Sequence, residues 1–257
     1  MQVIGAVRKL LSFAGMGLVV LSAKAQRAGE SPFDPRTTLA AAVTFTTGSR
    51  DLIAGFVTGR KILALSGDYD VRLHEGRRTE YRWEFEVLPL AFVSDPREVS
   101  DETSYPNGQP PTYYRYDALI ATPCVSGSDS GTYYTNNNGV GVEAGTFSST
   151  TKCSTAWTYS GGVSPLGQRI SFQPRKRLQP YLIVNAGFLA STRAVPLSDA
   201  AEFNFTAEGG AGVEIFESAK RSLTFDVRYH HLSNGGRGDE NPGVENVMFK
   251  VSYRVGR

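Results

Sequence analysis

The chain of 257 residues is poor in the features that mark several common classes of protein. It has no excess of one charge, with 27 Lys and Arg against 25 Asp and Glu, so its charge does not suggest a nucleic-acid partner. Its three histidines and two cysteines show no recognisable ligand spacing, and no metal or organic cofactor is expected. Beyond the N-terminal region it lacks an apolar run of the roughly 20 residues that a membrane-spanning helix needs.

The N-terminal region has the features of a secretory signal. The basic pair Arg8-Lys9 precedes an apolar run over residues 10–21, and an A-x-A cleavage signal follows at residues 23–25. The run is shorter than a membrane span, which weakens the alternative of a retained helix. We therefore expect residues 1–25 to be removed and residues 26–257 to form the exported domain.

Most of the mature chain has the pattern of short strands. In Thr79–Val93, large apolar residues alternate with charged ones, as in a half-buried strand, until Pro89 predicts a bulge or a strand end. About eight strands are expected, at residues 37–46, 61–73, 79–93, 161–172, 178–192, 203–216, 222–233 and 244–255. Eight is the smallest number usual for an outer-membrane barrel.

The connections between these strands alternate between short and long. Short joints are expected at residues 74–78, 173–177 and 217–221, and long ones at residues 48–60, 94–160, 194–202 and 234–243. Short periplasmic turns and long outer loops are typical of an all-β, antiparallel transmembrane barrel in the bacterial outer membrane. If both termini are periplasmic, the seventh strand runs outward and ends at the level of the outer leaflet.

Three residues with catalytic chemistry gather at the end of that seventh strand. Side chains two apart in a strand share a face, so His231 and Ser233 lie together on the apolar, lipid-facing side. Glu245 joins them on the same face when the last two strands pair as a hairpin. His230 points the opposite way, into a polar lumen. A serine activated by an imidazole, itself oriented by a carboxylate, is the arrangement of a serine esterase.

The sequence around these residues resembles a known family. Tyr229-x-His231-x-Ser233-Asn234-Gly235, followed by N-P-G-V-E at residues 241–245, is similar to the signature of the lipid A 3-O-deacylase (PagL) family of outer-membrane proteins. Weaker similarity to family strand motifs is found at residues 83–90, 162–172, 179–181 with Gly187, and 204–205 with Gly210 and Gly212.

The resemblance implies a carboxylic ester hydrolase that acts on lipid A of lipopolysaccharide. His231 is implied as the general base, Ser233 as the nucleophile and Glu245 as the residue that orients the histidine. Asn234, with the backbone amides of Gly235 and Gly236, is implied as the oxyanion donor. The implied reaction hydrolyses the acyl ester at the 3 position and releases a 3-hydroxy fatty acid. Arg237, in the adjoining loop, is a candidate contact for a lipid A phosphate.

The long connection at residues 94–160 departs from the compact family pattern. It is rich in Ser, Thr, Gly, Tyr and Asn, and we interpret it as an inserted extracellular loop. Cys124 and Cys153, which both lie in it, are expected to form a disulfide, because the protein is exported. Free thiols or a metal pair are the less favoured readings of the two cysteines.

Two other classes of function remain open. A non-catalytic outer-membrane barrel could use the long loop for binding or adhesion, since a fold does not guarantee turnover. A calcium-dependent outer-membrane phospholipase also uses His and Ser on a barrel face, but needs a larger barrel and a metal site. Acyl-chain preference and oligomeric state are not indicated by the sequence.

Overall fold

The computed structural model describes residues 33, 35–137 and 140–257, so the predicted signal at residues 1–25 lies outside the described residues. These residues form strands joined by turns and loops, and no helix among them is long and apolar enough to span a membrane. The strands are β1 (Thr37–Thr46), β2 (Gly55–Val57), β3 (Lys61–Glu75), β4 (Thr79–Pro106), β5 (Thr112–Leu119), β6 (Gly127–Asn137), β7 (Val140–Phe172), β8 (Leu178–Val195), β9 (Ala201–Ser218), β10 (Arg221–Ser233) and β11 (Gly243–Gly256).

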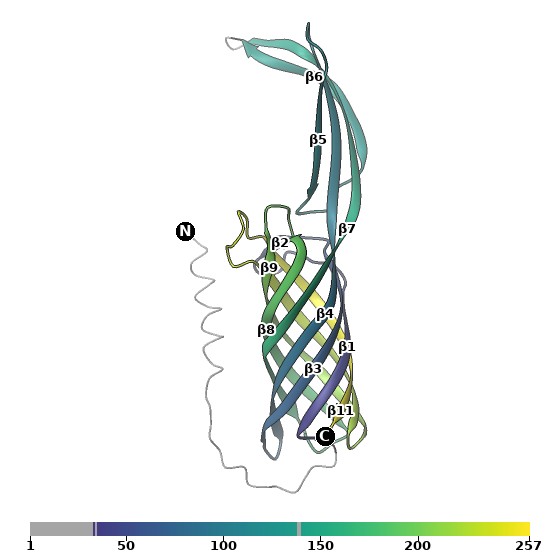
Figure 1. The fold of residues 1–257 in the computed structure, drawn as a ribbon, viewed down its shortest axis with the longest axis vertical. Helices are drawn as coiled ribbons and strands as arrows, with labels where there is room; N and C mark the ends of the chain where they lie inside the picture. Colours follow the sequence, from purple (N-terminus) through teal and green to yellow (C-terminus); the bar gives the residue numbers. More distant parts are fainter. Residues whose placement is uncertain (1–32, 34, 138–139) are drawn as a thin grey trace. The chain divides into compact units, whose positions relative to one another are not determined.

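Eight of the described strands close into an antiparallel ring. Consecutive pairings join β1 to β3, β3 to β4, β4 to β7, and β7 through β8, β9 and β10 to β11, and β11 pairs back with β1. Figure 1 shows these strands wrapped around one another as a barrel. The prediction of an all-β antiparallel barrel is confirmed. The predicted irregularity at Pro89 is also found, as a register shift between Leu88 and Ala91.

The barrel is polar inside and apolar outside. In β10 every second residue from Ser222 to Leu232 is buried, and this inward row includes Asp226, Arg228 and His230. The alternate residues face outward, and Phe225 and Val227 are among many large apolar side chains that remain exposed. This is the reverse of a water-soluble protein, where burying charge and exposing a continuous apolar band would both be costly.

The buried charges inside the barrel are held in ion pairs. Lys250 Nζ lies 3.0 Å from Asp68 Oδ1 and 2.9 Å from Glu86 Oε1. Arg228 is close to Asp226 at 2.6 Å and to Glu208 at 2.9 Å. Such pairing offsets the desolvation of the charges, and the Lys250 pairs join β11 to β3 and β4, which are not its neighbours in the ring.

Residues 94–160 were predicted to be a loop, and this prediction is wrong, because most of them form β-strands. β4 and β7 continue past the barrel and remain paired as far as Pro106 and Gly145, while β5 adds to β4 and β6 adds to β7. We call β5, β6 and the parts of β4 and β7 paired with them the extension. Its Thr and Tyr residues favour extended backbone, but both of its faces are largely exposed, so it lacks the apolar alternation by which a strand is detected.

Two cysteines tie the extension together near its base. Cys124 and Cys153 form a disulfide across 29 residues of sequence, with their Cα atoms 5.8 Å apart. The predicted disulfide is therefore confirmed. It fixes the connection between β5 and β6 to β7.

Candidate active site

The end of β10 and the start of β11 bring two of the three predicted catalytic residues face to face. His231 and Glu245 are direct cross-strand partners in the antiparallel register. Their inward-facing neighbours Leu232 and Val244 belong to the buried apolar cluster inside this end of the barrel. That packing anchors the strand ends, so the outward side chains of His231 and Glu245 are held at defined positions.

Glu245 lies on the outward face and is nevertheless completely buried. The chain before β2 covers it, and three backbone amides donate to its carboxylate: Leu52 at 2.9 Å, Ile53 at 2.6 Å and Ala54 at 2.7 Å. The Tyr229 hydroxyl donates a fourth hydrogen bond, at 2.5 Å to Oε1. Four donors around one carboxylate favour its ionised form and prevent its rotation.

The covering segment reaches Glu245 because glycine allows a close approach. β2 pairs in parallel with the start of β11, and Gly55 is the partner of Gly243. A side chain at Gly55 would place its Cβ 2.8 Å from Glu245 Cγ and 2.7 Å from the Gly243 carbonyl oxygen. A residue other than glycine would therefore push the segment away from the carboxylate.

His231 sits beside this carboxylate and is still accessible. Its Nδ1 lies 3.5 Å from Glu245 Oε1, and its side chain is 21% exposed. The contact is close enough for an ion pair, but it does not meet hydrogen-bond geometry, and Nδ1 is otherwise without a partner among the described residues. The ring lies against Gly243, where a Cβ would come within 3.0 Å of His231 Cε1.

Ser233 is on the same outward row as His231, at the last position of β10. Residues two apart in a strand are separated by about 6.6–6.8 Å along it. The two side chains are therefore neighbours on one face, but the spacing alone does not bring them into contact. The described residues show no hydrogen bond between them. The structure thus places the His-Glu pair in contact and the serine beside it.

The predicted oxyanion donors form a tight turn directly after Ser233. Asn234 donates from its backbone to Asn241 at 3.0 Å and from its side chain to the Glu240 carbonyl at 2.6 Å, and Gly236 N–H donates to Asn234 Oδ1 at 2.8 Å. The Asn234 side chain therefore holds the two ends of this loop together. The Gly235 N–H has no acceptor among the described residues and is the donor still available.

Glycine is required in this turn. Gly235 and Gly236 have φ values of 65° and 79°, in the left-handed region that residues with a Cβ adopt only at a cost.

Arg237 lies on the outward side of the loop, over an aromatic cluster. Its guanidinium is 5.0 Å from the ring centre of Phe203 and 4.8 Å from that of Phe205, and Phe188 stacks on Phe203. Phe205 is the cross-strand partner of Ser233, so the cation and the serine border the same aromatic surface.

The inward-facing His230 is separated from this site by the barrel wall. It is 4% exposed, on the same inward row as Asp226 and Arg228, as expected from the sequence.

Several contributors to the site were not identified from the sequence. The amides of residues 52–54 and the close approaches at Gly55 and Gly243 are invisible in a linear pattern, because the partners are more than 180 residues apart. Tyr229 could have been found, since it lies two residues before His231 on the same face and begins the motif noted above.

One group of carboxylates among the described residues has the spacing of metal ligands. Asp68, Glu84 and Glu86 place ligand oxygens within 4.8 Å of one another inside the barrel. The Lys250 ammonium, which contacts two of the three, supplies the positive charge at this position. The group is inside the barrel and belongs to its ion-pair network, whereas the candidate catalytic residues face outward.

Comparison with known proteins finds a family match over part of the chain and several similar solved structures. No curated protein sequence matches the chain, but residues 128–254 match the family model described as Lipid A 3-O-deacylase (PagL).

Among solved structures, the outer membrane enzyme PagL has 14% identity and a TM-score of 0.45, covering 86% of this chain and 99% of its own. Neisserial surface protein A has 12% identity and a TM-score of 0.39, covering 86% and 97%. Ail, the attachment invasion locus protein of Yersinia pestis, has 9% identity and a TM-score of 0.30, covering 86% and 99%. Residues 128–254, which include the catalytic candidates on β10 and β11, belong to the lipid A 3-O-deacylase (PagL) family.

Proposed function

We propose that this chain is an outer-membrane serine esterase that hydrolyses the 3-position acyl ester of lipid A. The observation that carries the proposal is the His231–Glu245 contact on the outward face of the barrel, with Ser233 next along the same row. The family match supports lipid A as the substrate, and the 3 position is taken from the activity in the family's description.

The distribution of apolar side chains supports a membrane setting. Outward residues such as Val227, Val247 and Val251 form an exposed apolar surface directly below the site. Leu52 and Ile53, in the segment that covers Glu245, also expose apolar side chains. In a bilayer these groups contact acyl chains, so the serine would meet an ester at the headgroup boundary without the lipid leaving the membrane.

The proposed chemistry is acyl transfer in two steps. His231 accepts the proton of the Ser233 hydroxyl as Oγ attacks the ester carbonyl, and the tetrahedral intermediate collapses when the sugar oxygen leaves with that proton. Water then attacks the acyl-serine while His231 accepts its proton, and His231 returns that proton to Ser233 Oγ as the 3-hydroxy fatty acid is released. The Gly235 N–H is the donor best placed in sequence to stabilise the oxyanion.

Glu245 and Arg237 have supporting roles in this proposal. The carboxylate orients His231 and stabilises the imidazolium that forms during attack, while its own four donors keep it ionised. Arg237, exposed at the edge of the aromatic cluster, is available for a phosphate of lipid A.

The test is the lipid A composition of bacteria that express the chain. The wild type should remove one 3-hydroxy acyl group, detected by mass spectrometry as the loss of that mass from lipid A. Ser233→Ala and His231→Ala should each lower the release by about a thousandfold or more, because removing either member disables the whole unit.

His230→Ala is the matched control for His231→Ala. It removes an adjacent imidazole that faces the lumen, so most of the activity should remain. Full activity in Ser233→Ala would overturn the serine mechanism. No release by the wild-type chain in an assembled barrel would favour a non-catalytic barrel that uses its extension for binding.

A further inference from the structure

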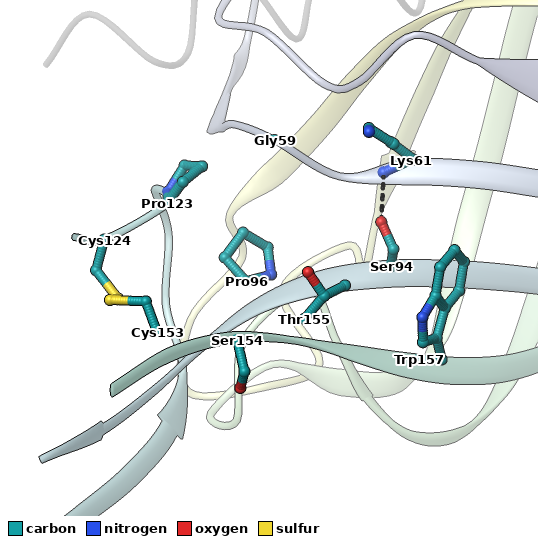
Figure 2. A pocket seen from close by; sticks show the side chains of 10 residues that line it. All are labelled: Gly59, Lys61, Ser94, Pro96, Pro123, Cys124, Cys153, Ser154, Thr155 and Trp157. Carbon is teal, nitrogen blue, oxygen red and sulfur yellow. Dashed lines mark hydrogen bonds between the residues drawn. A yellow bond between two sulfur atoms is a disulfide. The ribbon is translucent and has the colours of Figure 1, made fainter. Parts of the chain in front are cut away.

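A pocket lies at the junction of the barrel and the extension, away from the catalytic candidates. It is lined by Gly59, Lys61, Ser94, Pro96, Pro123, Cys124, Cys153, Ser154, Thr155 and Trp157, and its volume is about 510 Å³ (Figure 2). The pocket is built on β3, β4 and β7. In the ring, β1 separates β3 from β11, and β8 and β9 separate β7 from β10.

The walls of this pocket are fixed by a buried arginine. Arg60 is fully buried, and its guanidinium contacts Asp95 at 3.2 Å and donates to the carbonyls of Ile120 and Ala121 at 2.5 and 2.7 Å. Gly59 adopts a φ of 80° and lies so close to Pro123 that a Cβ would be 2.7 Å from the proline ring. The chain entering β3 and the chain leaving β5 are thereby locked together.

The pocket lining favours an anion. Lys61 carries the only full charge among the described residues that line it, and none of them has a carboxylate. The nearest acidic residue on β4, Asp95, is compensated by Arg60. Thr155 offers an exposed hydroxyl on the same face of β7 as Trp157, whose ring is 61% exposed, so the opening combines a cation, a hydroxyl and a flat aromatic surface.

The register of the strands places this polar group directly above an apolar row. Lys61, Ser94 and Trp157 are cross-strand partners, and Ser94 forms the buried floor between two exposed side chains. Two residues further along each strand the same face carries Leu63, Phe92 and Tyr159. A molecule with an anionic head and an acyl chain would match both rows at once.

We propose that this pocket binds the phosphate-bearing headgroup of a membrane lipid. The Lys61 ammonium pairs with the phosphate, the Thr155 hydroxyl donates to it, and the acyl chain lies over Leu63 and Phe92. This site rests on the membrane setting of the proposed function, but it does not depend on hydrolysis.

The pocket can be tested through Trp157 itself. The chain has two tryptophans, so a Trp83→Phe variant leaves Trp157 as the single fluorophore, and Ser233→Ala in the same chain removes the proposed hydrolysis. The purified protein in uncharged detergent is titrated with bisphosphorylated lipid A, with the same lipid after dephosphorylation, and with inorganic phosphate. We expect a saturable change in Trp157 emission with the first of these.

Two matched variants test whether the Lys61 ammonium binds the phosphate. Lys61→Gln should weaken binding of the phosphorylated lipid about tenfold, the effect of losing one hydrogen bond to a charged group, and should not change the response to the dephosphorylated lipid. Lys152→Gln makes the same substitution on the opposite face of β7 and should have no effect.

The remaining outcomes separate the explanations. A response to inorganic phosphate alone with equal strength would show a simple anion site and overturn the lipid assignment. Equal affinities in Lys61→Gln and the parent, or equal binding of both lipids, would overturn the pocket proposal. Binding as expected in a chain whose wild type releases no fatty acid would contradict the esterase and leave this site standing.

Discussion

At the scale of single residues, the candidate site depends on a carboxylate that is fixed before any substrate arrives. Glu245 accepts from Tyr229 and from three backbone amides, and its Oε1 atom also lies 3.5 Å from His231 Nδ1. A carboxylate held in this way needs little reorganisation when the imidazole gains a proton, which is the basis of electrostatic preorganisation.

Gly243→Ala tests how closely the His231 ring must be placed. The new Cβ would lie 3.0 Å from His231 Cε1 and 3.1 Å from the Ala54 carbonyl oxygen, so the ring or the covering segment must shift. Since a displacement of about 1 Å can cost a hundredfold in rate, kcat should fall on the order of tenfold to a hundredfold. The measurement is the rate of fatty acid release by the purified enzyme.

Gly67→Ala is the control for this substitution. It adds the same methyl group to an outward position on β3, where the nearest atom would be at 3.8 Å, so activity and assembly should be unchanged. If Gly243→Ala were as active as Gly67→Ala, the packing of the ring on Gly243 would have no catalytic importance.

At the scale of elements, the extension is a sheet without a core. Its cross-strand contacts must therefore come from the backbone and from polar pairs, and one of these pairs is well formed. Arg97 on β4 donates from Nε and Nη2 to the two carboxylate oxygens of Asp117 on β5, at 2.7 and 2.6 Å. Such a bidentate pair has more geometric specificity than a single contact between exposed charges.

This pair predicts a pH dependence for the attachment of β5 to β4. The hydrogen bond from Arg97 lowers the pKa of Asp117 below its ordinary value of 3.8. A folded pKa below the unfolded one means that the stabilisation is complete above the unfolded pKa and is lost as the pH falls through the folded value. An NMR titration of the Asp117 carboxyl should give a midpoint below 3.8, and Arg97→Gln should raise it toward that value.

Arg115→Gln, on the same strand as Asp117, is the control for Arg97→Gln. Arg115 pairs with Asp101 at 3.3 Å and has a smaller influence on Asp117, so its loss should move the midpoint less. An Asp117 midpoint that is the same in Arg97→Gln and in the wild type would show that the pair does not form in solution.

At the scale of the whole molecule, the barrel has a polar interior and an apolar exterior, so we expect it to be stable when hydrocarbon surrounds its outer face. Val227→Arg tests this directly, because Val227 faces outward from the middle of β10 and is 47% exposed. A charge at the bilayer midplane should lower the free energy of unfolding by about 2–4 kcal/mol. Urea titration of the barrel in lipid vesicles measures it.

Val125→Arg makes the same change outside the barrel. Val125 is 89% exposed in the connection between β5 and β6, and its replacement should alter the unfolding free energy by no more than about 0.5 kcal/mol. Equal effects of the two substitutions would mean that the outward face of β10 does not contact hydrocarbon.

The sequence by itself determined the ring strands and the faces of their side chains. Strand propensity and the period of two are local properties of extended backbone. Thr37–Thr46, rich in small and β-branched residues, therefore has the predicted bounds, and His231, Ser233 and His230 fall on the predicted sides of β10. The motif at the end of β10 likewise needs only neighbouring residues to be recognised.

Only the tertiary structure decided what surrounds these residues. The amides that hold Glu245 come from Leu52, Ile53 and Ala54, and the pocket at the extension depends on Arg60 reaching Ile120 and Ala121. The extension itself escaped prediction because a sheet exposed on both faces has no apolar alternation. These features are contacts between distant parts of the chain, and closure of the ring is what brings those parts together, so no local pattern records them.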